Sequence, residues 1–404
     1  MDPEAHLLDL DPDDVVDEYR RRGLADVPDA ELGAAAAAVI GRGHPGTPSS
    51  FLLHAPLELI ARTTLLRLVD PAHRTAARQR IAWLAATHAR AVGPQPLPDH
   101  RPTDDPASTA AMLARAVDAG ELDDAGDLAG SLAAGTTADE LVGLAADVVV
   151  PRLGAAGHGT IFLHLLRTYA AGSPRAAAMF AALARELARH PGLAVTWADG
   201  AGERSNHGDL DEALRSVPHL GPLESDFIAP TTGRVESAGL ADDLLRPSVG
   251  SSTDIAQATR ALLRVAAESM LVDDAAVAPY GWSHALTIPQ AIAGVARTAS
   301  DPAAAIGVAA THLAGFRASS GAADLRRPTA PPSTAPTVTE LATNAAVHPD
   351  AHLAKYTLAA IEATRTDPSH RRLYLAAAGR LRDVWRERPI GADPILSPAP
   401  AAGS

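Results

Sequence analysis

The chain has 404 residues, of which 47% are hydrophobic and 3% aromatic, and its formal net charge is −13 at pH 7. A chain of this length can bury a large core. Because nucleic acids and anionic membrane surfaces are bound by basic stripes, this charge argues against both partners. Cysteine is absent, which excludes disulfide scaffolds, cysteine-ligated zinc, iron–sulfur clusters and a cysteine nucleophile. Any metal must therefore have nitrogen or oxygen ligands.

The N-terminal segment is acidic and lacks the basic and apolar regions of a secretory signal. The alanine-rich runs are interrupted by charge, and none reaches the roughly 20 apolar residues that a membrane span needs. We therefore expect a cytoplasmic protein without a membrane segment.

Most segments between proline and glycine residues have helical spacing and are rich in Ala, Leu, Glu and Arg, which favour helices. In chain order, the pattern predicts helices over residues 11–22, 29–41, 51–69, 71–92, 107–119, 122–134, 137–149, 157–171, 174–190, 209–215, 253–271, 283–298, 302–317, 338–346, 349–365 and 370–387.

Loops are predicted over residues 93–106, 198–252 and 326–337, and strand-like alternation is confined to Leu193–Trp197. We predict an all-α protein with one large multi-helical domain over residues 1–388. Two helical halves that meet near residues 200–250 are the alternative. The Pro/Ala/Ser-rich segment 389–404 is predicted to be a disordered tail.

The signature motifs of serine hydrolases, P-loop proteins, dinucleotide-binding folds, HExxH metalloproteases and di-iron bundles are missing. His348-Pro349-Asp350 matches the His-x-carboxylate half of a facial metal triad. The same three residues also fit the start of a helix, with proline in the first turn and a carboxylate beside the positive helix end.

Sixteen histidines fall into two groups. A single histidine in an apolar helix is usually a hydrogen-bonded core residue, but several in a cysteine-free chain favour a metal. Seven have such apolar helical settings: His54, His88, His158, His164, His284, His312 and His352. We expect solvated side chains for the nine that lie in loops or beside charge or proline: His6, His44, His73, His100, His190, His207, His219, His348 and His370.

Lys355 is the only lysine, beside 34 arginines, in a chain where about twenty lysines would be usual. Its neighbours on the helix face, three and four residues away, are Ala351, His352, Leu358 and Ala359, so no carboxylate can pair with it locally. A buried ammonium beside an imidazole is expected to lose its proton or to change chemically. A neutral amine can react with carbon dioxide to form a carbamate, an anionic oxygen ligand. The alternatives are an ion pair with a distant carboxylate, or no special role.

Four segments each place a histidine beside small or apolar residues: Phe51-Leu-Leu-His54-Ala-Pro-Leu, Ala156-Gly-His158-Gly-Thr-Ile, Ser283-His284-Ala-Leu-Thr and Asp350-Ala-His352-Leu-Ala-Lys355. In this order, over residues 45–385 as a whole, they resemble the questin oxidase-like family, which includes fungal anthraquinone and aflatoxin-pathway ring-opening oxidases. The last segment resembles the family's D-x-H-x-x-K element. The first resembles its N-H-L-P helix, although Leu53 replaces the usual Asn, and the second and third are similar to its H-G-L-I and H-A-V-T elements.

The resemblance implies a helical fold with a buried mononuclear non-haem iron site between helices, held by four histidines and a carboxylated lysine. Carried over by position, the ligands are His54, His158, His284, His352 and Lys355. The implied reaction uses Fe(II) and dioxygen for Baeyer–Villiger oxidation or dioxygenase cleavage of a polycyclic aromatic, anthraquinone-like metabolite. No motif supports NADPH as a further cofactor, and the sequence does not indicate an oligomeric state.

His158 and His164 are six residues apart, about 240° around a helix, so both can hardly face one site. We take His158 as the ligand. His164 and His312 are predicted as catalytic acid–base residues, although His312 and His88 also fit a core role. The predicted substrate pocket consists of Tyr280, Trp282, Phe162 and Tyr356.

Two other classes of function fit the same sequence. A metal-free helical protein that binds a hydrophobic metabolite would use the apolar histidines as ordinary core residues. A zinc-dependent hydrolase would use the same ligands, but five ligands leave little room for the open four-coordinate site of such enzymes. The acidic charge favours a neutral, flat substrate over a phosphorylated one.

Overall fold

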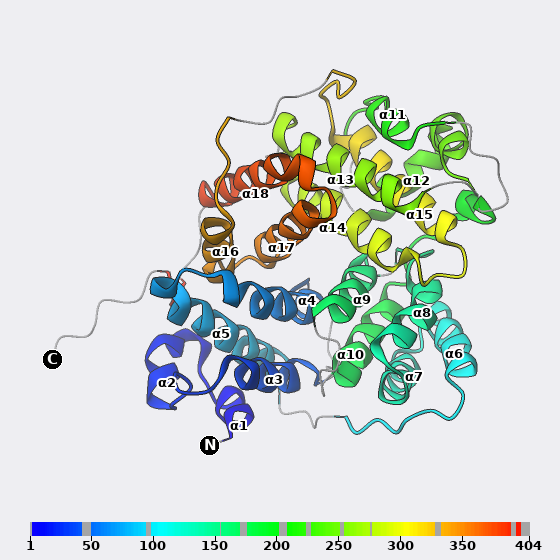
Figure 1. Ribbon diagram of the computed structural model, residues 1–404. Coiled ribbons are helices and arrows are strands. Elements are labelled where there is room, and N and C mark those ends of the chain that lie inside the picture. Colours follow the sequence, from blue (N-terminus) through cyan, green and yellow to red (C-terminus); the bar gives the residue numbers. More distant parts are fainter. Residues whose placement is uncertain are drawn as a thin grey trace.

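The computed structural model describes residues 2–42, 50–93, 98–153, 155–169, 176–201, 208–223, 228–250, 254–274, 277–327, 333–388 and 393–396. Across these ranges the chain forms one multi-helical body without a β-strand (Figure 1). The predicted all-α fold class is therefore confirmed. Among the described helices, none is both long and apolar enough to cross a bilayer.

Most helices begin and end within a few residues of their predicted bounds. They are α1 (Pro3–Leu8), α2 (Val15–Arg21), α3 (Asp29–Ile40), α4 (Ser50–Leu65), α5 (Arg74–Val92), α6 (Pro106–Ala119), α7 (Leu122–Gly135), α8 (Ala138–Val149), α9 (His158–Tyr169), α10 (Ala176–Arg189), α11 (Leu210–Arg215), α12 (Ile228–Ser237), α13 (Ile255–Val272), α14 (Pro279–Ala296), α15 (Pro302–Ser320), α16 (Val338–Val347), α17 (Ala351–Thr366) and α18 (Arg371–Arg386).

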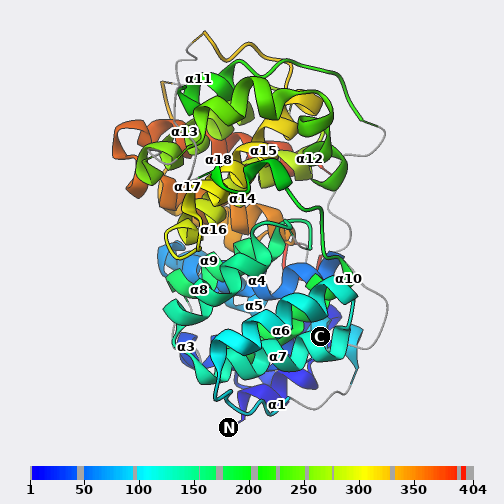
Figure 2. The ribbon, with the colours of Figure 1, turned by 90° about the vertical axis from the view of Figure 1, so that its right-hand side faces the viewer.

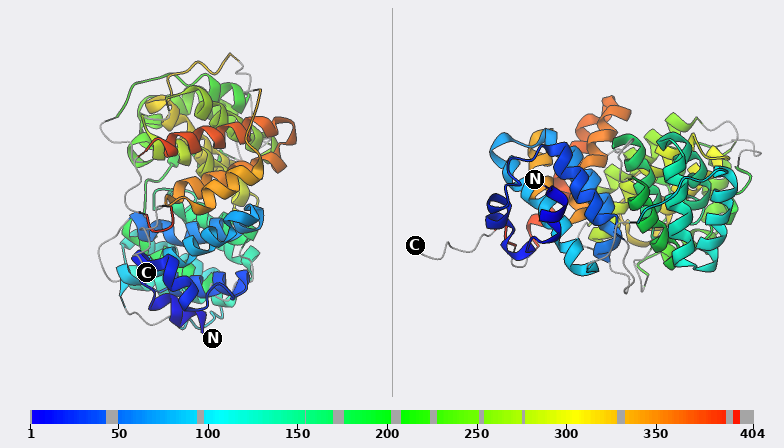
Figure 3. Two further views of the ribbon diagram at one scale, coloured as in Figure 1. Left: turned by 90° about the vertical axis from the view of Figure 1, so that its left-hand side faces the viewer. Right: turned by 90° about the horizontal axis from the view of Figure 1, so that it is seen from below.

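Four of these helices pack in a closed ring at the middle of the body. α4 contacts α9, α9 contacts α14, α14 contacts α17, and α17 returns to α4. Figure 2 and the left-hand view of Figure 3 show α1–α3, α6 and α7 toward one end and α11–α13 and α15 toward the other. The ring thus joins two helices from the first half of the chain to two from the second half.

α17 is the most deeply buried member of the ring. Its residues from His352 to Thr364 are all buried, as expected for a helix that is apolar on nearly every side. The helix begins where Asp350 accepts a hydrogen bond from the His352 amide at 2.8 Å. Of the two interpretations of His348-Pro349-Asp350, the helix start is thus the one that the structure supports.

Two sequence predictions need correction, and the one strand-like pattern forms no strand, as the all-α prediction implies. The predicted loop over 198–252 contains α12, whose Thr231, Thr232 and Val235 are buried against the body. The strand-like Leu193–Trp197 forms no strand, and Thr196–Ala198 is a 3-10 turn. Within the predicted disordered tail, residues 393–396 are described, and Asp393 is buried in an ion pair with Arg80.

Candidate metal centre

The ring of helices brings four histidines together, one from each helix. His54, His158, His284 and His352 are all buried, and each offers a ring nitrogen within 4.8 Å of the others. His158 is the first residue of α9, whereas the other three lie within α4, α14 and α17. These are the four histidines that the family resemblance selects.

The rings meet through their Nε2 atoms. The Nε2 of His54 lies 2.9 Å from that of His158 and 3.0 Å from that of His352, and the Nε2 atoms of His158 and His284 are 3.2 Å apart. Two metal ligands at about 2.1 Å are about 3.0 Å apart at a right angle and about 3.4 Å apart at the tetrahedral angle. The observed spacing therefore fits ligands at right angles better than a tetrahedral set.

Hydrogen bonds at the opposite ring nitrogen assign the tautomers of three rings. Nδ1 of His158 donates to the Ala155 carbonyl at 2.8 Å, and Nδ1 of His284 donates to the Tyr280 carbonyl at 2.8 Å. Nδ1 of His352 donates to the Asp350 carboxylate at 2.9 Å. Because these acceptors hold the proton at Nδ1, a neutral ring presents a lone pair at Nε2.

Burial keeps three of the four imidazole rings neutral. It lowers the pKa of His158 and of His284 well below the usual value, and nearby positive groups lower both further. Burial also lowers the pKa of His352 to about 4. Two neutral rings with Nδ1 protonated cannot hydrogen-bond through Nε2, so the lone pairs of His158 and His284 face each other across 3.2 Å. A divalent cation between the rings would remove this repulsion, so the donor set fits a metal.

Lys355 lies one helical turn after His352 and is fully buried in the body. Its Nζ has no hydrogen-bond partner among the described residues. Burial lowers the pKa of the amine to about 7, although Asp350 and Glu58 partly oppose this effect. Its positive charge also lowers the pKa of His158, His284 and His352, so the amine lies close to the cluster. The structure gives no support for the alternative ion pair.

A strained turn sets the position of His158. Leu153, Ala155 and Ala156 have left-handed backbone conformations with φ of 46°, 49° and 55°, and Gly157 follows with φ of 76°. Non-glycine residues rarely adopt this conformation, at a cost of roughly 1–2 kcal/mol each, and such strain is typical of functional sites. Here the turn points the Ala155 carbonyl at Nδ1 of His158.

A cavity of about 960 Å³ opens beside the histidines. The four ring helices supply the metal-side wall, which includes Phe51, Glu58 and Tyr280. The rest of the lining comes from α10, α12, α15 and the segment after α10, and its residues include Glu186, His190, Leu193, Thr231, Thr232 and Phe316. None of the described lining residues is arginine or lysine. The volume suits a multi-ring ligand.

Two of the six predicted pocket and catalytic residues line this cavity. Tyr280 is 46% exposed, and its ring centroid lies 4.6 Å from that of His352. His312 of α15 lies next to His284, and burial lowers the pKa of His312 to about 4, so its ring is neutral at pH 7.

The other four predicted residues do not line the cavity. Trp282 packs edge-on behind Phe316, with the ring centroids 4.6 Å apart. Phe162 stacks on Phe180, and Tyr356 is buried in α17. His164 turns away because it is six residues beyond His158, and its Nε2 lies 3.0 Å from Oε2 of Glu362. His164 therefore does not reach the cavity, where its predicted acid–base role would place it.

The histidines predicted to be solvated have mixed surroundings. His73, His190 and His219 are exposed. His348 is half-buried instead, because the end of α16 and the start of α17 enclose it, and burial lowers its pKa to about 4. His44 and His207 lie outside the described residues.

The sequence analysis missed three ionisable residues of the cavity wall as site residues: Glu58, Glu186 and His190. One signal for Glu58 was present, since it lies four residues after His54 and therefore on the same face of α4. Glu186 and His190 belong to α10 and the segment after it, which only the tertiary structure brings to the site. A scan against protein-family models found no match, and neither did searches of curated proteins and of solved structures.

Proposed function

We propose that the protein is a non-haem iron-dependent oxygenase that acts on a polycyclic aromatic, anthraquinone-like secondary metabolite. The observation that carries the proposal is the convergence of neutral histidine lone pairs beside an unpaired buried amine, at the wall of a large cavity. The resemblance of four segments to the questin oxidase-like family selects the same five residues.

The donor set suits iron. His54, His158, His284 and His352 would hold the metal, with Lys355 as a fifth, anionic ligand. Imidazole and oxygen ligands suit Fe(II), and the right-angle spacing of the nitrogens disfavours a tetrahedral zinc site. A ferrous ion held there supplies dioxygen activation for ring cleavage or for Baeyer–Villiger-type oxygen insertion.

The buried amine of Lys355 can react with carbon dioxide. With a pKa of about 7, about half of its amine is neutral at pH 7. The Nζ lone pair forms a nitrogen–carbon bond with carbon dioxide, one carbon–oxygen double bond becomes single, and a proton leaves the nitrogen. The product is a carbamate anion beside the four imidazoles, where its charge would offset part of that of a divalent metal.

The cavity favours a neutral ring system that can donate hydrogen bonds. Phe51, Phe316 and Tyr280 offer aromatic surface, and Glu58 and Glu186 offer carboxylate acceptors for ring hydroxyls. Because the described lining lacks arginine and lysine, nothing in it would pair with a phosphate or carboxylate on the ligand.

Metal analysis of protein purified after expression with iron tests the proposal, together with oxygen uptake in the presence of a tricyclic hydroquinone. We expect about one iron per chain and ligand-dependent oxygen consumption, both strongly reduced in His352→Ala and Lys355→Ala. His164→Ala is the matched control, because this partly buried histidine also lies on one of the four ring helices but faces Glu362. Metal-free wild type, or His352→Ala and Lys355→Ala variants that behave like wild type, would contradict the proposal.

The cavity alone also supports a second function, the binding of a hydrophobic metabolite without a metal. This function predicts ligand binding that is unchanged by a chelator and occurs without oxygen uptake. The same two measurements therefore separate the two candidates.

A further inference from the structure

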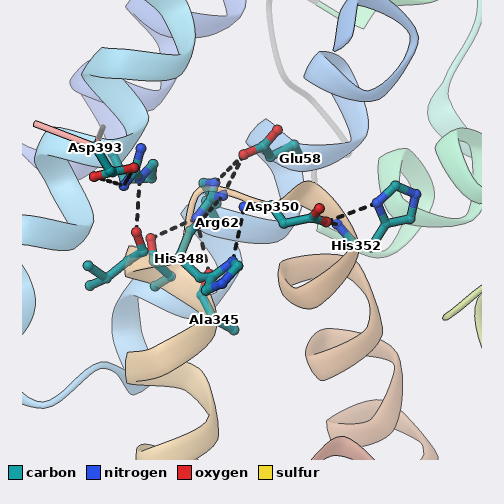
Figure 4. Close-up of polar contacts among 10 residues, drawn as sticks. Glu58, Arg62, Ala345, His348, Asp350, His352 and Asp393 are labelled. Atoms are coloured by element: carbon teal, nitrogen blue, oxygen red, sulfur yellow. Dashed lines mark hydrogen bonds and ion pairs between the residues drawn. The ribbon is translucent and has the colours of Figure 1, made fainter. Parts of the chain in front are cut away.

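Two buried arginines, Arg62 and Arg80, donate hydrogen bonds to backbone carbonyls at the turn between α16 and α17, and Figure 4 shows Arg62 at this position. Arg62 donates to the carbonyls of Ala346 at 2.8 Å and His348 at 2.7 Å, and its Nε donates to Glu58 at 2.6 Å. Arg62 therefore binds the last carbonyls of α16 while its own helix, α4, carries His54 two turns earlier.

Arg80 of α5 binds the same turn from the other side. Its Nε donates to the Val347 carbonyl at 2.9 Å, and its Nη2 donates to both carboxylate oxygens of Asp393, at 2.8 and 2.7 Å. The Arg80 side chain is fully buried, and that of Asp393 is 5% exposed. Asp393 lies in the described segment 393–396 near the C-terminus.

The two arginines are close enough for their charges to interact. Burial and the positive charge of Arg62 lower the pKa of Arg80 to about 10, whereas the charge of Asp393 opposes this effect. Glu58 pairs with Arg62, and Asp393 pairs with Arg80. Without Asp393, two buried guanidinium groups would share one buried carboxylate, which would disfavour the position of Arg80 beneath the turn.

The turn continues directly to a predicted metal ligand. His348 Nδ1 accepts a hydrogen bond from the Asp350 amide at 3.0 Å, and Asp350 then accepts from both the amide and Nδ1 of His352. Figure 4 shows these contacts as one series from Asp393 to the His352 ring. A displacement of Val347 or His348 would be transmitted to Asp350 and so to the orientation of that ring.

We propose that Asp393 is a positioning residue for the metal centre, acting through Arg80 and the α16–α17 turn on the orientation of His352. This inference rests on the proposed metal site. It gives the segment 393–396, which lies outside the cavity wall, a role in metal affinity.

Co²⁺ titration of metal-free, full-length protein, followed by visible absorption, tests the proposal. We expect Asp393→Asn to weaken Co²⁺ binding about tenfold, since the loss of groups that orient metal ligands typically costs 10–100-fold in affinity. The matched control is Asp383→Asn, which removes a half-exposed carboxylate paired with Arg382 on α18. Wild-type affinity in Asp393→Asn would overturn the proposal.

A double variant separates positioning from stability. Arg80→Met with Asp393→Asn removes the unpaired buried charge, so the urea midpoint is expected to recover toward wild type. Co²⁺ affinity should remain about tenfold weaker, because no group then holds the Val347 carbonyl. If affinity recovered together with stability, Asp393 would act only on the stability of the fold, and the positioning role would be wrong.

A measurement on the wild type covers the case in which the variants fail to fold. The amides of Ile395 and Leu396 donate to Asp393 at 3.0 and 2.9 Å, so their hydrogen exchange reports whether this segment is docked. Because coupling is reciprocal, Co²⁺ should slow their exchange about tenfold. Bound Co²⁺ with unchanged exchange would overturn this inference alone, whereas a wild type that binds no Co²⁺ would overturn the proposed metal site as well.

Discussion

Replacement of Lys355 by methionine should stabilise the metal-free protein while it removes the proposed anionic ligand. The amine is fully buried, and its Nζ lacks a hydrogen-bond partner in the described part of the chain. Methionine is unbranched and of similar length, so it can fill the same space without a charge. The buried helix α17 would otherwise stay unchanged.

The size of the effect follows from the pKa of the amine. Burial lowers this pKa from 10.5 to about 7, and each unit corresponds to about 1.4 kcal/mol, so the buried lysine costs about 4 kcal/mol at pH 7. The unfolded chain binds the extra proton between pH 7 and 10.5, so wild-type stability rises with pH across this window. The advantage of methionine should therefore fall below about 1 kcal/mol by pH 10.

Urea unfolding at pH 7, 8.5 and 10 measures this difference. The buffers must contain a chelator and be free of carbon dioxide, so that neither a metal nor a carbamate stabilises the wild type. A methionine variant that is no more stable than wild type at pH 7 would refute the reasoning. A gain that does not change with pH would show that packing, rather than the buried charge, is its cause.

Two further predictions concern groups that hold the ring helices in place. Asp367 accepts hydrogen bonds from Arg264 at 2.6 Å and Tyr374 at 2.9 Å, and these bonds lower its pKa despite burial. Asp367→Asn should cost about 2–3 kcal/mol at pH 7. The loss should shrink below about pH 4, because the carboxylate of the unfolded wild type then binds a proton that the folded carboxylate, with its lowered pKa, does not. Equal losses at pH 7 and pH 3 in urea unfolding would contradict this. Gly157 has a positive φ of 76°, and a Cβ there would lie 2.5 Å from Cδ1 of buried Ile288, whereas Gly120 has a left-handed backbone with φ of 73° and a Cβ there would lie 3.6 Å from its nearest neighbour, the Ala188 carbonyl oxygen. Gly120→Ala should cost about 1–2 kcal/mol from the backbone alone, and Gly157→Ala should cost more and weaken Co²⁺ binding through its neighbour His158. Equal unfolding free energies and Co²⁺ affinities in the two variants would argue against this role for the turn.

The sequence predicted most helices because their apolar spacing is local. α12 was missed, since its proline, glycine and threonine residues favour loops, and its stability comes from packing against α15. In the site, the spacing of residues 158 and 164 indicated that these two histidines cannot both face one cluster, and the family resemblance selected His158. The ion pair between Arg80 and Asp393 joins residues from opposite ends of the chain, and no local pattern encodes such a contact.

The two parts of the cavity lining differ in which substitutions they can accept without loss of metal binding. The four clustered histidines lie on α4, α9, α14 and α17. On α4, His54, Glu58 and Arg62 share one helix face. A substitution on these four helices would therefore alter the geometry of the metal ligands and the shape of the cavity together. The wall from α10, α12 and α15 carries none of the four clustered histidines. Libraries aimed at new ligands should therefore vary positions such as Leu193, Thr231 and Phe316, where selectivity can evolve while metal binding is retained.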